Sequence, residues 1–463
     1  MKRRQLGYLT LSHLLLILLI TTSGLPLQAS PPSQRGLPLT LTPLDIPRQW
    51  VELVQEQVDK QGLDLPATAR LTAYLMITLY EATLPDMAGA TSLAGKLTTM
   101  PALPQPKVGM RYDSATVAIG ALASVAEALL NAALPTETAR RASARNVASL
   151  RINQSRLRLQ SIPVEIIDRS LTLGDALGAV MATWAATDGA TALRSRPFVI
   201  PTGADRYWQA TTPTQAPVQP FWGSLPGLIQ PDERCTVPLR LAFATEAGST
   251  FHYQAMEVYQ LVKTMTPEQA EIVNFWGYET PGATVGAGNV NRPLVGNAAT
   301  RWLLLADQVA QAQKMTLAQA AALYAPIALS LHETIIAVWR TQYAAFLLRP
   351  ASYIRQWIEE SWQPLYPAPN TPAYPSPEAA IGAAAAAVLT ARLGFQPVID
   401  YTRLTDDTRN GRRFTTFDAA AYEHGMAALY AGTTFRTAVE SGLQQGQCIG
   451  YSVVNQLSAE TKP

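Results

Sequence analysis

The chain has 463 residues, of which 48% are hydrophobic and 15% are charged, and its formal net charge is +2. This composition allows a sizeable core and excludes an intrinsically disordered chain. The small net charge provides no basic excess, so nucleic acid is not an expected partner. The length fits two or three domains, or one large intertwined domain.

Residues 1–29 have the pattern of a signal peptide. Three cationic residues at 2–4 precede an apolar run at 9–20, and Ala29 ends a cleavage pattern. We therefore expect an exported protein, periplasmic or extracellular, with residues 30–47 as a leader or linker. An uncleaved N-terminal anchor is the alternative. Later segments contain no clean apolar stretch of spanning length, so we expect no membrane span in the mature chain.

Helical periodicity dominates residues 48–234, the predicted N-terminal half. Apolar spacing and capping residues predict helices over 48–60, 66–82, 114–134, 137–160 and 171–187. The helix at 114–134 is apolar almost all round, which predicts burial. The helix at 137–160 alternates arginine with small residues, which predicts exposure. Prolines and glycines at 90–110 and 195–235 predict a loop and an extended surface segment.

The predicted C-terminal half, residues 235–455, is also helical. The same patterns predict helices over 254–263, 267–276, 298–313, 317–348, 378–393 and 417–432. Loops are expected at 281–293, 364–377 and 404–413, and no segment has the pattern of a central strand. We therefore predict an all-α fold, a large helical bundle whose two halves share one core.

Cys235 and Cys448 are the two cysteines of the chain. In an oxidising compartment they could form a disulfide that ties the middle of the chain to its end. The sequence does not show whether the two residues meet, so the pairing stays open. Two cysteines and the few histidines lack the spacing of a zinc site, and we expect no metal centre.

Three separated segments, residues 339–350, 374–378 and 423–436, carry a recognisable set of motifs. Their order and spacing are similar to the signature of the superfamily that joins vanadium haloperoxidases to type 2 phosphatidic acid phosphatases. The chain most resembles its soluble bacterial haloperoxidase-like branch. This resemblance implies a helical bundle of the vanadium haloperoxidase type, a vanadate or phosphate site, and a homodimer.

In that family the oxyanion is held by one Lys, two Arg, a Ser hydroxyl and backbone donors at a helix start. One His bonds to vanadium or attacks phosphorus, and another acts as acid or base. The resemblance places Arg349 at the first Arg, Ser376 at the Ser and Gly432 at a conserved-motif Gly. Gln342 stands at the Lys position, where it can donate a hydrogen bond but has no charge.

The other motif positions are substituted. Pro377 stands where a Gly donates its backbone N–H, which proline lacks, and Glu378 stands at the acid–base His. Ala427 and Ala428 replace the Ser-Arg pair, and Thr434 replaces the His that would bond vanadium or phosphorus. The resemblance therefore implies a site whose oxyanion-binding and catalytic side chains are mostly lost.

The number of charges at the motif positions indicates how these substitutions affect oxyanion binding. The family site has roughly three fixed positive charges, whereas this chain keeps Arg349 and gains the negative charge of Glu378. At an effective dielectric of about 20, one charge pair about 4 Å apart is worth roughly 4 kcal/mol. We therefore expect no cofactor and a pseudoenzyme that serves as a scaffold or binding protein. The alternative is an active vanadium haloperoxidase or acid-phosphatase-like enzyme, with vanadate as cofactor or with an altered site around Arg349, Ser376, Glu378 and His424.

Two residues near the motifs have competing interpretations. Ser376-Pro377-Glu378 suits a helix start, with a Ser cap, a Pro at the first position and an acid in the first turn. A sharper hypothesis is that Glu378 fills the former oxyanion site and pairs with Arg349. His424 lies four residues before Ala428, and so on the same helical face. It could form an acid–base pair with Glu378, or it could be a packing residue.

Overall fold

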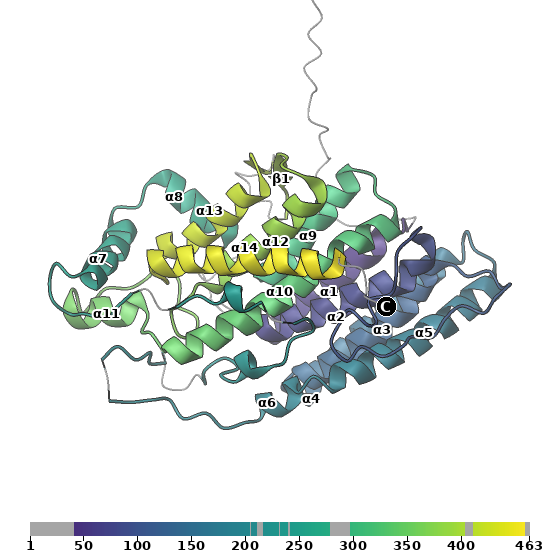
Figure 1. The fold of residues 1–463 in the computed structure, drawn as a ribbon, viewed down its shortest axis with the longest axis horizontal. Helices are drawn as coiled ribbons and strands as arrows, with labels where there is room; N and C mark the ends of the chain where they lie inside the picture. The colour runs from purple at the N-terminus through teal and green to yellow at the C-terminus, as the bar shows by residue number, and fades with distance from the viewer. Residues whose placement is uncertain are drawn as a thin grey trace, which may run out of the picture.

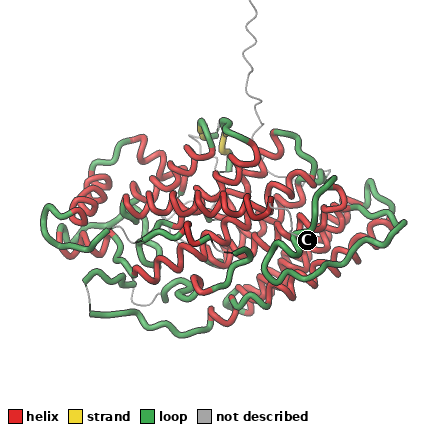
Figure 2. The backbone as a smooth tube through the Cα atoms, viewed as in Figure 1, coloured by secondary structure: helices red, strands yellow, loops and turns green. Residues whose placement is uncertain are grey.

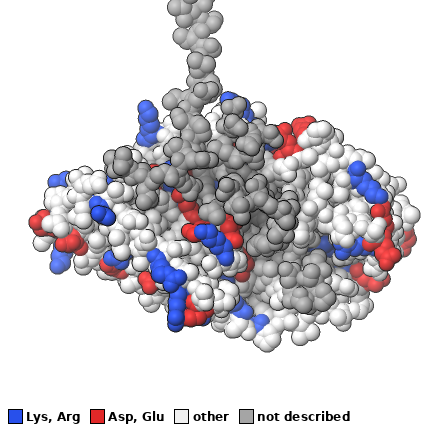
Figure 3. Space-filling view, turned by 180° about the vertical axis from the view of Figure 1, so that it is seen from behind, with Lys and Arg blue, Asp and Glu red and all other residues white. Residues whose placement is uncertain are grey.

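The computed structural model describes residues 41–203, 205–210, 216–230, 232–238, 241–277, 297–402 and 411–458. The predicted signal peptide, the predicted loop at 281–293 and residues 404–410 of the predicted loop at 404–413 lie outside these residues. Within them the chain is mostly helical, as predicted (Figures 1 and 2). Charged side chains are scattered among uncharged ones on the face shown in Figure 3.

The N-terminal half forms a set of long helices that begin at clear caps. Asp64, Asp113 and Thr136 each accept a hydrogen bond from a backbone N–H of the turn that follows. In chain order the helices are α1 (Asp45–Gln61), α2 (Leu65–Thr83), η1 (Leu84–Asp86), α3 (Ser114–Ala133), α4 (Glu137–Arg158), α5 (Val164–Ala186) and α6 (Ala190–Arg194). Helices α3, α4 and α5 lie along one another and extend to one end of the molecule (Figure 1).

The C-terminal half contains more helices than predicted. The predicted helix at 317–348 ends at Ala345, because Phe346 adopts a left-handed φ of 48°. From residue 222 onward, and so including two short elements before residue 235, the elements in chain order are η2 (Trp222–Ser224), η3 (Glu233–Cys235), α7 (Thr250–Lys263), α8 (Pro267–Trp276), α9 (Ala298–Ala312), α10 (Leu317–Ala345), α11 (Pro350–Trp357), α12 (Pro377–Leu393), β1 (Val398–Asp400), β2 (Arg412–Phe414), α13 (Phe417–Tyr430) and α14 (Arg436–Ser458). The strands form one antiparallel pair, with Val398 opposite Phe414.

Both halves contribute to one hydrophobic core, as predicted. The main cluster of buried apolar residues runs from α1, at Ile46, to α14, at Val453. A second cluster lies where α7 and α11 meet α13 and α14, and it contains Phe251, Tyr353 and Phe435. The sharing of the main core makes the two halves one cooperative packing unit.

Two helices correct the expectation about apolar segments. By length and composition α3 and α10 could each cross a membrane. Within the bundle, however, 72% of the most apolar window of α3 and 89% of that of α10 are buried. Burial in a protein core accounts for their composition, because a core helix is apolar on every side.

Helix α14 packs against α12 through a line of glycines. Gly442, Gly446 and Gly450 recur at every fourth residue and therefore lie on one face. A Cβ added at Gly446 would lie 1.9 Å from the carbonyl oxygen of Ala380, and one at Gly450 would lie 2.6 Å from that of Ala384. These two helix backbones are close enough that only glycine fits on the α14 side.

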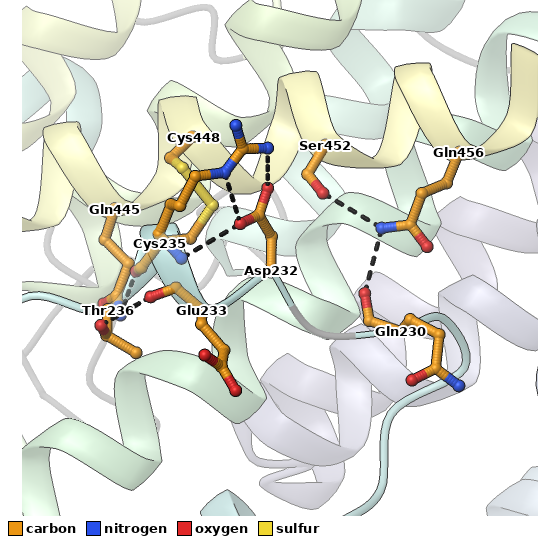
Figure 4. The surroundings of a disulfide bond; sticks show 10 residues. Gln230, Asp232, Glu233, Cys235, Thr236, Gln445, Cys448, Ser452 and Gln456 are labelled. Atoms are coloured by element: carbon orange, nitrogen blue, oxygen red, sulfur yellow. Dashed lines mark hydrogen bonds and ion pairs between the residues drawn. A yellow bond between two sulfur atoms is a disulfide. The ribbon is translucent and has the colours of Figure 1, made fainter. Parts of the chain in front are cut away.

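A disulfide joins Cys235 to Cys448, which settles the pairing that the sequence left open (Figure 4). The Cα atoms are 5.4 Å apart, and 213 residues separate the two cysteines in the chain. Gln445, one turn before Cys448 on α14, donates from Nε2 to the Cys235 carbonyl oxygen at 3.2 Å. The bridge therefore attaches the segment around η3 to the surface of α14.

Candidate functional site

The three motif segments converge in space. Gln342, in the last turn of α10, donates from Nε2 to the carbonyl oxygen of Pro375 at 3.0 Å. Arg349, which precedes α11, donates from Nη1 to the carbonyl oxygen of Thr433 at 3.0 Å. The Ser376 backbone N–H donates to the Ala438 carbonyl oxygen, also at 3.0 Å. Segments that the sequence places up to about a hundred residues apart thus meet at the starts of α11, α12 and α14.

Arg349 is almost fully buried, with 1% of its surface exposed. Besides its bond to Thr433, its Nε donates to the Thr371 carbonyl oxygen at 2.8 Å and its Nη2 to Thr371 Oγ1 at 2.7 Å. The guanidinium therefore links the loops at Thr371 and Thr433 to the start of α11 by hydrogen bonds. At least three of its five N–H groups are occupied by protein oxygens.

Gln342 presents an acceptor where the family has a cation. Its side chain is fully buried, and its amide nitrogen is committed to the Pro375 carbonyl, which can only accept. This bond fixes the orientation of the amide, so Oε1 points away from Pro375. Among the described residues Oε1 has no hydrogen-bond donor. A buried lone acceptor disfavours an anion nearby.

Helix α12 begins at a cap formed by Ser376, Pro377 and Glu378, as the interpretation of these residues as a helix start predicted. Ser376 Oγ accepts from the Ala379 backbone N–H at 3.4 Å and donates to Glu378 Oε2 at 2.9 Å, and Pro377 is the first residue of α12. No ion pair within 4.0 Å joins Glu378 to Arg349, although both lie in the described part of the chain. The hypothesis that Glu378 pairs with Arg349 is therefore wrong, because the Glu378 carboxylate instead accepts a hydrogen bond from Ser376, the N-cap of its own helix.

His424 is a core residue and does not pair with Glu378. Its ring stacks on Trp276, with centroids 4.4 Å apart and planes at 19°, and its Nδ1 accepts from Trp302 Nε1 at 3.2 Å. Burial, with a smaller effect from the Arg301 guanidinium, lowers the pKa of His424 to about 3. The packing interpretation holds, because the imidazole is neutral and enclosed by aromatic rings of α8 and α9.

The remaining motif positions are buried and have packing roles. Gly432 has a φ of +81°, and a Cβ there would lie 2.8 Å from Val262 Cγ2, so the turn requires glycine. Ala427 and Ala428 have 1% and 0% of their surface exposed. Thr434 is 1% exposed, and its hydroxyl lies 3.5 Å from the Ala373 carbonyl oxygen, at the limit of a hydrogen bond.

Two buried acids, Asp307 and Glu333, lie apart from the motif positions. Burial raises the pKa of Asp307 to about 7, and its carboxylate accepts from Tyr324 Oη at 3.0 Å. Burial likewise raises the pKa of Glu333 to about 7, although the backbone N–H of Leu228 donates to it at 2.6 Å. Each carboxylate lies on a helix and accepts a hydrogen bond from a neighbouring segment. Their only sequence signal was a charge inside an apolar run.

Metal ligands and cavities give no second site among the described residues. No group of three or more His, Cys, Asp or Glu side chains in that part of the chain is arranged to hold a metal ion. A cavity of about 10 Å³ lies between α2, α3 and α6 and is lined by Arg70, Arg194 and Trp222, among others. This volume is close to that of a single water molecule, and no motif residue borders it.

Comparisons with known proteins support the same fold. Residues 322–462 match the model of the family described as VCPO second helical-bundle domain. The crystal structure of the first bacterial vanadium-dependent iodoperoxidase is similar to the chain, with a TM-score of 0.77 and 23% identity, over 91% of this chain and 98% of that one.

Two crystal structures of bacterial vanadium-dependent chloroperoxidase are similar as well. The holo form has a TM-score of 0.63 and 13% identity, over 87% of this chain and 93% of that one. The apo form has a TM-score of 0.62 and 14% identity, over 86% and 95%. None of the curated proteins matches the sequence. The chain therefore has the helical-bundle fold seen in the bacterial vanadium haloperoxidase structures, and its residues 322–462 match the family model of the second bundle domain.

Proposed function

We propose that this chain is an exported haloperoxidase-like protein that has lost vanadate- and phosphate-dependent catalysis and serves as a scaffold or binding protein. One observation carries the proposal. Arg349, the cation kept at the motif positions, is 1% exposed and donates hydrogen bonds to Thr371 and Thr433. A side chain already bonded on several sides to protein oxygens is poorly placed to bind an external trianion.

The residues around Arg349 do not fit vanadate. A bound vanadate ion needs cations, N–H donors and a nitrogen ligand around it. Gln342 instead presents an acceptor oxygen, Pro377 has no N–H, and Thr434 has a hydroxyl in place of an imidazole. Ala428 supplies no charge. These substitutions together support the loss of the oxyanion site, and no catalytic step is assigned to it.

The test measures vanadate and phosphate binding by calorimetry, and peroxide-dependent oxidation of bromide and iodide, on the purified protein. We expect no binding at millimolar oxyanion and no turnover above buffer. Binding at micromolar concentration, or turnover that vanadate stimulates, would overturn the proposal.

A restored variant provides the matched positive control. It combines the substitutions that return the family side chains: Gln342→Lys, Pro377→Gly, Glu378→His, Ala427→Ser, Ala428→Arg and Thr434→His. If this variant folds, judged by circular dichroism, and binds vanadate while the natural chain does not, the changed side chains account for the loss. Export is tested separately, by N-terminal sequencing of the secreted protein, which should begin at Ser30.

A further inference from the structure

Helix α4 carries six arginines and a single acidic residue, Glu137, over 22 residues. Four of the arginines form ion pairs, either with Glu137 or with Asp175 and Asp113 on neighbouring elements. The other two, Arg145 and Arg156, are exposed and form no ion pair with any described residue. The helix therefore presents cationic charge to its surroundings.

The free arginines share a face with exposed aliphatic side chains. Arg145, Ser149, Ile152, Arg156 and Leu159 follow one another at spacings of three and four residues, which places them along one side of the helix. Ile152 is 63% exposed and Leu159 is 46% exposed. A soluble helix usually places such residues toward a core. Here they lie between guanidinium groups on the outer surface.

Two further segments extend this face at the end of the helix. The loop before α3 exposes Val108 and Met110, at 103% and 53%, and the first residue of α5, Val164, is 50% exposed. Arg169 of α5 holds this loop, because its Nη1 donates to the Arg111 carbonyl oxygen at 3.3 Å. The loop and the α4–α5 junction thus lie together, at the end of the molecule to which α3, α4 and α5 extend (Figure 1).

We define the basic tip as the exposed apolar and cationic residues of these segments: Val108, Met110, Ile152, Leu159, Val164, Lys107, Arg111, Arg145 and Arg156. We propose that the basic tip docks the protein peripherally on a bilayer containing anionic phospholipid. The aliphatic side chains enter the interface between headgroups and acyl chains, and the cations face the phosphates. This proposal does not depend on the fate of the former oxyanion site.

Shape and charge favour a bilayer over a peptide partner. The aliphatic residues lie on a projecting end, whereas a bound peptide usually docks in a groove or along a sheet edge. A bilayer can receive a convex surface, because its lipids rearrange around inserted side chains. Lys107, Arg111 and Arg156 are the cations of this end, where Glu165 and Asp168 are exposed carboxylates, and Arg145 lies about 16 Å away along α4. Cations therefore exceed carboxylates, and the charge complements an anionic surface.

The first test compares vesicle binding of the full chain by co-sedimentation. Vesicles of equal parts phosphatidylglycerol and phosphatidylcholine should bind the protein, and pure phosphatidylcholine should bind it at least tenfold less. The double variant Arg145→Gln/Arg156→Gln should weaken binding to the anionic vesicles on the order of tenfold. The matched control Arg392→Gln/Arg413→Gln removes the same charge from exposed positions elsewhere and should bind normally. Raising the salt concentration should weaken binding.

The second test addresses insertion. Val108→Ser/Met110→Ser should weaken vesicle binding several-fold, whereas Phe395→Ser, at a 76% exposed aromatic remote in sequence, should not. All variants should melt at the natural temperature, since the substituted side chains are exposed. The proposal is overturned if anionic vesicles do not bind the protein, or if the control variants lose binding equally. It is also overturned if the tip variants instead disperse a dimer in gel filtration, because a second copy would then be the partner.

Discussion

At the scale of single residues, the retained motif positions have structural roles. Arg349 joins the loops at Thr371 and Thr433, and Ser376 caps α12. Hydrogen bonds from a buried charge to neutral oxygens stabilise a fold only while every partner is in place. The retained motif residues are therefore those with protein partners of their own, and their retention does not require a ligand.

His424 makes the fold sensitive to acid. The pKa of His424 in the folded state is about 3, below the ordinary value of 6.5. The neutral imidazole therefore contributes fully to the free energy of unfolding above pH 6.5, and this contribution is lost as the pH falls toward 3. Each pH unit in that window costs at most about 1.4 kcal/mol. His424→Gln keeps an acceptor for Trp302 but does not titrate. Urea unfolding at pH 7 and pH 4.5 should show a smaller acid-induced loss in this variant. Equal losses in both proteins would contradict the expectation.

Motif order and spacing marked the segments that meet near Arg349 and Ser376, whereas the sequence left the orientation of His424 open between two interpretations. The direction of His424 depends on tertiary neighbours, because α13 is buried on several sides and has no apolar stripe to reveal its face. The Trp276 and Trp302 rings that enclose it come from helices more than a hundred residues earlier.

At the scale of elements, the contact between α12 and α14 is the one that the sequence analysis missed. The predicted last helix ended at 432, and α14 was not predicted at all. Its signal was present, since Gly442, Gly446 and Gly450 recur every four residues, the spacing of a close helix contact. Glycine lowers helix propensity, so a pattern based on apolar residues overlooks such a helix. Ala380 and Ala384 form the α12 side of this contact.

Substitution of Gly446 should test this contact most directly. A Cβ there would lie 1.9 Å from the Ala380 carbonyl oxygen, so the two helices would have to separate. Gly446→Ala should lower the free energy of unfolding by about 3 kcal/mol or more, despite the better helix propensity of alanine. Denaturant unfolding followed by circular dichroism measures this. The neighbouring exposed Gln447→Ala is the control, and an equal effect in both variants would argue against a backbone-limited contact.

At the scale of the whole molecule, two halves share one core, and one disulfide closes a covalent loop within the C-terminal half. The fold class and the shared core were predictable, because amphipathic periodicity extends through most of the chain. The disulfide was not predictable, since 213 residues separate Cys235 from Cys448 and only the packed fold shows that they meet. The basic tip was visible in part, as an exposed helix rich in arginine at 137–160.

Removal of the bridge should lower stability without changing the fold. A closed loop of this length restricts the unfolded chain, and loss of such a bond typically costs about 2–5 kcal/mol. A reductant should therefore lower the melting temperature of the natural protein, followed by circular dichroism. Cys235→Ala/Cys448→Ala should melt at the reduced temperature with or without reductant. A melting temperature that the reductant leaves unchanged would contradict this.

The bridge also divides the polypeptide into a covalent ring, a long N-terminal tail and a short C-terminal tail. Every motif position, from Gln342 to Thr434, lies on the ring between Cys235 and Cys448, whereas the basic tip lies on the tail that precedes it. A single proteolytic cut within the ring therefore leaves one covalent species on a non-reducing gel, and a cut in the tail releases a fragment. Cleavage among the motif positions and cleavage at the basic tip can thus be distinguished in the same digest.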